Sequence, residues 1–153
     1  MSGTVEHIHI ADRPGAPVRP LSSVAATPRG GLAGDRNAKP PGAAYESSDS
    51  CDLTLIEAEK LEELEREHGI ELAPGESRRN ITTRGIRLND LVGREFWVGD
   101  VLARGVELCE PCSHLQSLLG KPIIKPLIHK AGLRADVLSG GTISIGDSVR
   151  PRA

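Results

Sequence analysis

The chain has 153 residues, a length typical of one domain that buries a core without disulfides or metals. Its formal net charge of -2 and its three aromatic residues argue against nucleic-acid binding, which needs a basic surface or stacking side chains. No apolar run approaches about 18 residues and residues 1–6 do not resemble a signal peptide, so we expect a cytoplasmic protein that does not enter membranes. Three cysteines, an odd number, favour free thiols over a disulfide framework.

Two β-strands are predicted near the N-terminus. Val5–Ala11 alternates apolar and polar residues, and Val18–Ala26 follows a turn over Asp12–Gly15. His7 and His9 share the polar face of the first strand. With no third metal ligand nearby, we interpret this face as solvated.

A glycine-rich turn follows the second strand. Gly30, Gly31 and Gly34 allow positive backbone φ angles and a close approach of N–H groups to an anion. Their spacing differs from both the dinucleotide fingerprint and the P-loop. Residues 37–50 are rich in Pro, Gly, Ala and Ser, which predicts a flexible loop that lies over a site.

The longest helix is predicted over Leu55–His68. Thr54 and Glu57 have the spacing of a capping box, and Gly69 ends the apolar periodicity. The many carboxylates of this segment are typical of a solvated helix face, so we interpret the helix as structural.

Two adjacent arginines precede the next strand, Ile81–Thr83. Arg78, Arg79 and Asn80 can present planar donors to a phosphate or carboxylate, or the arginines can form an exposed basic pair. The residues alone leave both interpretations open.

The second half predicts a helical turn followed by short strands separated by tight turns. The helical turn covers Asn89–Gly93, and the strands cover Glu95–Val98, Val101–Leu108, Leu133–Leu138, Thr142–Ile145 and Ser148–Arg150. This pattern indicates a curled or closed, largely antiparallel sheet with one main helix.

The strongest chemical feature is the segment Cys109-Glu-Pro-Cys112. Ser113 and Gln116 have capping-box spacing for a short helix over Leu115–Leu119, which places Cys112 at the helix N-terminus. Unpaired N–H groups there favour a thiolate, so Cys112 is the candidate nucleophile or soft-metal ligand. Cys109 lies closer to the strand, and we expect it to be packed and inert.

A series of short motifs runs along the chain in a fixed order. They are Gly34–Arg36, Leu55–Ala58, Ser77–Ile81, Arg84–Gly85, Leu91–Gly93, Val98–Asp100, Cys109–Cys112, Ala131–Arg134, Gly140–Gly141 and Ile145–Val149. Together they resemble the MOSC domain family, named for the C-terminal domain of molybdenum cofactor sulfurases. The resemblance is strongest over residues 29–149 and implies one MOSC domain over 1–153, with a barrel-like fold and peripheral helices.

The resemblance also implies a function. In the family a cysteine binds sulfur or ligates molybdenum held by a pterin dithiolene, and Cys112 matches that position. We therefore expect a molybdenum-pterin cofactor or a transferred sulfur at Cys112, His114 as a neighbouring proton carrier, and a sulfur-donor or electron-donor protein as partner. The remaining expected cofactor-binding residues, with the arginines as anion holders, are Gly34, Asp35, Arg36, Arg78, Arg79 and Asn80. The chain has Asn37 where single-domain relatives often have histidine.

Three other functions fit the residues. Cys109 and Cys112 can form a redox dithiol, although the βαβ pattern of a thioredoxin-like fold is missing. The same pair can form a zinc module with two of Cys51, His114 and His129, although the spacing is not that of a known finger. The third is a binding module that has kept the fold and lost the chemistry.

Overall fold

The computed structural model describes residues 2–36, 38 and 52–153. Its strands are β1 (Gly3–Ala11), β2 (Val18–Leu21), β3 (Ser23–Thr27), β4 (Gly31–Leu32), β5 (Leu53–Glu57), β6 (Ile81–Arg84), β7 (Glu95–Val98), β8 (Val101–Leu108), β9 (Leu133–Ser139), β10 (Gly141–Ser144) and β11 (Ser148–Pro151). The helices are α1 (Ala58–His68), α2 (Ser113–Leu119) and the short 3-10 turns η1 (Leu88–Leu91) and η2 (Lys125–Leu127). The loop predicted over 37–50, apart from Ala38, lies outside these residues.

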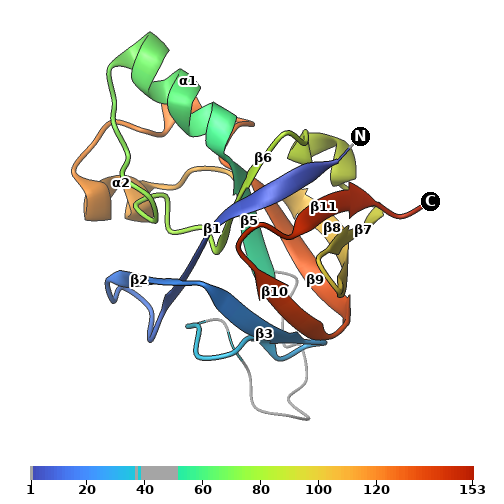
Figure 1. The fold of residues 1–153 in the computed structure, drawn as a ribbon. Helices are drawn as coiled ribbons and strands as arrows, with labels where there is room; N and C mark the ends of the chain where they lie inside the picture. The colour runs from blue at the N-terminus through green and yellow to red at the C-terminus, as the bar shows by residue number, and fades with distance from the viewer. Residues whose placement is uncertain (1, 37, 39–51) are drawn as a thin grey trace.

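A closed barrel forms the centre of the described structure (Figure 1). Its strands follow the order β11-β7-β8-β9-β5-β6-β1, and β11 pairs back onto β1 to close the ring. All neighbouring strands are antiparallel except β5 and β6. The prediction of a mostly β, barrel-like fold of short antiparallel strands is confirmed.

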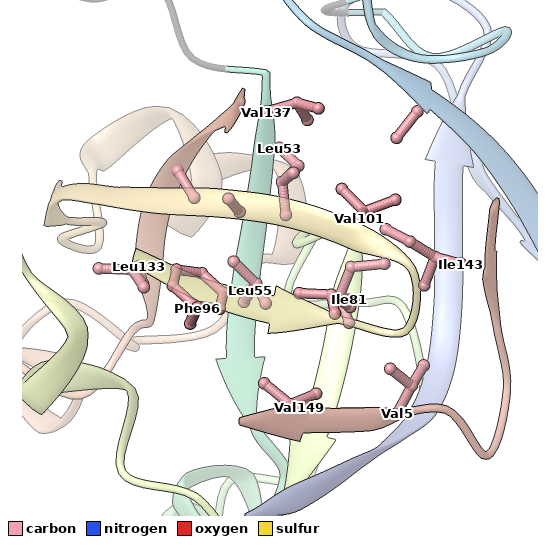
Figure 2. Packing of buried hydrophobic residues seen from close by; sticks show 14 of the residues in the cluster. Val5, Leu53, Leu55, Ile81, Phe96, Val101, Leu133, Val137, Ile143 and Val149 are labelled. Carbon is pink, nitrogen blue, oxygen red and sulfur yellow. The ribbon is translucent and has the colours of Figure 1, made fainter. Parts of the chain in front are cut away.

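The barrel interior is filled by aliphatic side chains and one phenylalanine (Figure 2). Leu55, Ile81, Phe96, Leu133 and Val149 are all fully buried there. They come from β5, β6, β7, β9 and β11, and along a barrel strand the side chains alternate between the inside and the outside. In β7 and β9, where the outward residues are less buried, this gives the alternation of apolar and polar residues visible in the sequence.

The strand predicted over Val18–Ala26 is two strands. β2 pairs with β1 on the barrel, whereas β3 pairs with β10 and β4 in a second, three-stranded sheet. The break at Ser22 lets the chain leave one sheet for the other. This switch depends on β10, more than a hundred residues later in the sequence, and therefore left no local signal.

The predicted start of the long helix is wrong. Leu53–Glu57 is strand β5, buried at every residue and paired with β6 and β9, and α1 begins only at Ala58. Thr54 caps no helix, because its hydroxyl and backbone N–H bond the side chain of buried Asn80. Pairing on both strand edges outweighs the local helix propensity of this segment. Gly69 ends α1 in the left-handed conformation, as predicted.

The interpretation of the first strand's polar face as solvated is wrong for His9. Its side chain is buried, and the ring lies against the backbone of Gly75, where an added Cβ would come within 2.6 Å of the ring. Burial first, and the charge of His7 second, hold the pKa of His9 below its ordinary value. Gly75, in the loop between α1 and β6, covers this ring, which no local pattern indicates.

The two α-helices lie on the same side of the barrel (Figure 1). A second apolar cluster joins them, formed by Leu64, Leu115, Ile123, Leu127 and Ala131. The segment that carries Cys112 is therefore packed on this cluster and not on the barrel core. No helix in the described ranges is long and apolar enough to cross a membrane.

Candidate functional site

The cysteine segment connects the end of β8 to α2. Cys109 is buried, as predicted, whereas Cys112 is exposed, and both are free thiols. Cys112 itself is the N-cap of α2, and its Sγ accepts a hydrogen bond from the backbone N–H of Leu115 at 3.4 Å. The predicted capping box is therefore wrong in its residues: Gln116 accepts a bond from Ile124. The thiol takes the place that a serine or aspartate oxygen usually has.

An open cleft of about 250 Å³ lies directly beside Cys112. The predicted site residues at its walls are Arg36, Arg78, Arg79, Cys112 and His114. Four other residues complete the lining, namely Pro14, Gly15, Leu115 and Leu118. The structure thus brings together the exposed thiol, three arginines and a histidine from three separate segments. The contribution of the Asp12–Gly15 turn was missed, since the sequence shows it only as a connection.

Arg36 and Arg78 form the basic part of the cleft. Arg36 donates to the backbone oxygen of Arg78 at 2.8 Å and lies 3.6 Å from the carboxylate of Asp35. Arg78 adopts a left-handed backbone with φ 61°, and its Nη2 is buried with no hydrogen-bond partner among the described residues. Burial, followed by repulsion from Arg36, lowers the pKa of Arg78. A strained residue with an unpaired guanidinium N–H beside a second cation is the arrangement that an anionic ligand would complete.

Arg79 has a different set of contacts from its neighbour. Its guanidinium donates to the backbone oxygens of Ala131 at 2.8 Å, Cys109 at 3.2 Å and Glu110 at 3.4 Å. Although Arg79 lines the cleft, most of its N–H groups donate to backbone carbonyl oxygens.

The other predicted cofactor-binding residues lie behind the cleft walls. Asn80 is fully buried and joins β5, β6 and β1 through Thr54 and the backbone oxygen of His9. Asp35 is buried, accepts a bond from the backbone of Ala11 and lies beside Arg36. Gly34 has φ 80° in the turn and is absent from the cleft lining. These three residues support the walls of the cleft.

One pair beside the thiols was not singled out by the sequence. The Glu110 carboxylate accepts the backbone N–H of His129 at 2.7 Å and lies 2.6 Å from its ring Nδ1. His129 has φ 60°, so these two contacts with Glu110 hold a left-handed residue in place. Nδ1 of this ring, which was proposed as a zinc ligand, lies against the Glu110 carboxylate, so only Nε2 is left for another partner. Among the described residues, which exclude Cys51, no group of three His, Cys, Asp or Glu side chains is placed to hold a metal.

The donor set defines what this cleft can bind. Cys112 offers an exposed sulfur, which suits a soft metal or a transferred sulfur atom, and Arg36 and Arg78 offer cationic donors to an anionic group. The chemistry of these donors fits a molybdenum-pterin cofactor, which carries both a soft-ligand metal and anionic oxygens.

The comparisons with known proteins agree with this fold. The YuaD protein of Bacillus subtilis is 16% identical, with a TM-score of 0.82 over 97% of this chain and 94% of that one. The YiiM proteins of Geobacillus stearothermophilus and Escherichia coli are each 18% identical, with TM-scores of 0.75 and 0.72. They align with 99% and 100% of this chain, and with 75% and 70% of their own. No curated protein sequence matches the chain. A family model described as the MOSC domain matches residues 43–150, and the chain belongs to the MOSC domain family.

Proposed function

We propose that this protein binds a molybdenum-pterin cofactor, or receives a sulfur atom, through the thiolate of Cys112. The observation that carries the proposal is that one cleft is lined by the exposed Cys112 and by Arg78, whose buried Nη2 has no hydrogen-bond partner among the described residues. A thiolate beside an arginine that lacks an anionic partner suits a ligand with an anionic group at one end and a thiolate-binding centre at the other. The association of the family with molybdenum cofactor sulfurases supports the same ligand.

Four residues of the cleft have a defined role in this proposal. Cys112 would hold the metal, and Arg36 and Arg78 would bind the anionic oxygens of the ligand. The bound cofactor would supply oxidation and reduction of a small-molecule substrate, with electrons from a donor protein. His114, exposed on the first turn of α2 and at the cleft wall, would carry a proton.

The sulfur-carrier form uses the same residues without a metal. The Cys112 thiolate attacks the outer sulfur of a donor persulfide, the new S–S bond forms as the donor's S–S bond breaks, and the donor leaves as a thiolate. The transferred sulfur stays on Cys112 as a persulfide. No external oxidant enters the balance, since the donor persulfide is already oxidised.

Native mass spectrometry with metal analysis tests the proposal on protein purified from a host that makes molybdenum cofactor. We expect either molybdenum with a pterin-sized mass, or a mass gain of one sulfur, in the wild type and not in Cys112→Ala. Cys109→Ser should retain most of the load, because this thiol is buried away from the cleft. Equal loss of bound molybdenum or sulfur in Cys112→Ala and Cys109→Ser would instead favour a redox dithiol formed by both cysteines.

The anion site is tested with a charge-matched pair. Arg78→Gln should lose at least about tenfold in loading, as expected for one charged hydrogen-bonding group. Arg87→Gln removes the same charge from a side chain that is 76% exposed, and should load like the wild type. Equal loading of both variants would contradict the role of Arg78.

A further inference from the structure

The two adjacent arginines, Arg78 and Arg79, differ in their hydrogen-bond partners. Arg78 lines the cleft and has a buried N–H group without a partner among the described residues, whereas Arg79 donates to three backbone carbonyls from two separate segments. Two of these carbonyls belong to Cys109 and Glu110, which precede Cys112 with only Pro111 between. The third belongs to Ala131, 52 residues from Arg79 along the chain.

The same two segments are also joined directly. The backbone N–H of Cys109 donates to the oxygen of Gly132 at 2.8 Å, and the carboxylate of Glu110 receives the backbone and ring nitrogens of His129. The guanidinium of Arg79 lies where the two segments meet, because it donates to carbonyl oxygens in both of them. The backbone leading to Cys112 is therefore anchored on both sides, by a planar guanidinium and by a bidentate carboxylate.

We infer that Arg79 is a positioning residue for Cys112 and not a ligand for the anion. Cys112 caps α2 only in the extended backbone conformation that it adopts, φ -129° and ψ 164°, which turns Sγ toward the N–H of Leu115. The frame of Arg79, Glu110 and His129 fixes the preceding residues and so fixes this conformation. A lysine at position 79 would keep the charge but lacks the planar fork that reaches three carbonyls.

The inference rests on the thiol that the proposed function uses, but its test needs no bound ligand. The rate of Cys112 alkylation by neutral iodoacetamide and by anionic iodoacetate is measured by mass spectrometry on the folded protein. We expect Arg79→Lys to slow iodoacetamide about fivefold, the effect of losing one helix N-cap bond. The ratio of the iodoacetate rate to the iodoacetamide rate should stay at its wild-type value, since the charge is kept.

Two variants serve as matched controls. Arg78→Gln removes a cation from the cleft and should lower the ratio, because the anionic reagent loses an attraction that the neutral reagent does not have. Val149→Ala, in the fully buried barrel core, lowers stability without touching the frame and should leave both rates unchanged. Glu110→Gln weakens the other anchor of the frame and should slow iodoacetamide in the same direction, which tests the inference even where Arg79→Lys does not fold.

Two results would overturn the inference. A wild-type iodoacetamide rate in Arg79→Lys, or in Glu110→Gln where only that variant folds, would show that the frame does not position the thiol. Equal slowing in Val149→Ala would show that lost stability alone explains the effect. A wild-type protein that takes up neither molybdenum nor sulfur would end the proposed function and leave this alkylation result standing.

Discussion

At the scale of single residues, Arg78 has features that lower the stability of the fold but suit the binding of an anion. It combines a left-handed backbone with a guanidinium N–H that has no partner among the described residues, and its pKa is lowered by burial and by Arg36. Groups arranged at this cost to stability are typical of binding sites.

We therefore expect Arg78→Gln to raise the free energy of unfolding by about 1 kcal/mol while it reduces ligand loading, because it removes a poorly solvated charge. Urea unfolding of the ligand-free protein checks the first part. Arg87→Gln, on an exposed side chain, should leave the unfolding midpoint unchanged. A less stable Arg78→Gln variant would mean that the arginine supports the fold.

His9 predicts a pH dependence of stability. Its folded-state pKa lies below the ordinary value of 6.5, because of burial and then the charge of His7, so the unfolded chain binds the proton more tightly. The stability that neutral His9 contributes is fully present well above pH 6.5. It decreases as the pH falls below 6.5 toward the folded-state pKa. We expect a loss of up to about 1 kcal/mol between about pH 7.5 and about pH 5.5.

Urea midpoints at the two pH values measure this loss. In His9→Gln the difference between the midpoints should shrink, whereas His114→Gln, an exposed histidine of α2, should keep the wild-type difference. The same pH difference in the wild type and His9→Gln would assign the effect to another group.

At the scale of elements, two glycines differ in what they support. Gly120 ends α2 with φ 63° and has open space where a side chain would be. Gly132 has φ 110° just before β9, and an added Cβ would collide with the backbone oxygen of Leu55 in β5. The first glycine serves the helix end alone, and the second lets two barrel segments touch.

The two alanine variants should therefore differ in unfolding free energy. Gly120→Ala should lower the free energy of unfolding by about 1 kcal/mol, because a residue with a Cβ is strained in the left-handed conformation. Gly132→Ala should cost about 3 kcal/mol or more, because the collision is with backbone that cannot move aside. Thermal unfolding measures both, and similar costs would refute the close approach of β5 to Gly132.

At the scale of the molecule, the described residues form two apolar clusters. The larger fills the barrel, and the smaller joins α1, α2 and the segment around Ile123. Cys112 depends on the smaller cluster for its helix. A small cluster provides less free energy against local opening than a barrel core does.

We expect Ile123→Ala, at a fully buried position, to destabilise this cluster by about 2–4 kcal/mol. Amide hydrogen exchange should rise in α2 and α1 while β5 and β9 stay protected. Leu55→Ala, in the barrel core, is the comparison and should raise exchange in every element. Uniform acceleration in Ile123→Ala would show that both clusters open as one unit.

Much of the fold was predictable from local pattern. Strands β7 to β11 were predicted to within about two residues, because alternating apolar residues and glycine turns mark each one. The N-terminal position of Cys112 was also readable, since a helix-forming run follows it directly. β5 was not readable, because a segment buried on both faces lacks the alternation that identifies a strand.

By itself the sequence determined a β-rich chain, the strands of its second half, the family and a cysteine at a helix start, since these depend on neighbours a few residues apart. The tertiary structure decided that His9 is buried, that Leu53–Glu57 is a strand, and how Arg78 and Arg79 divide their roles. Arg78 meets Arg36 across 42 residues and Arg79 meets Ala131 across 52. Side-chain roles set by such distant partners leave no trace in local sequence, because the backbone must fold before they meet.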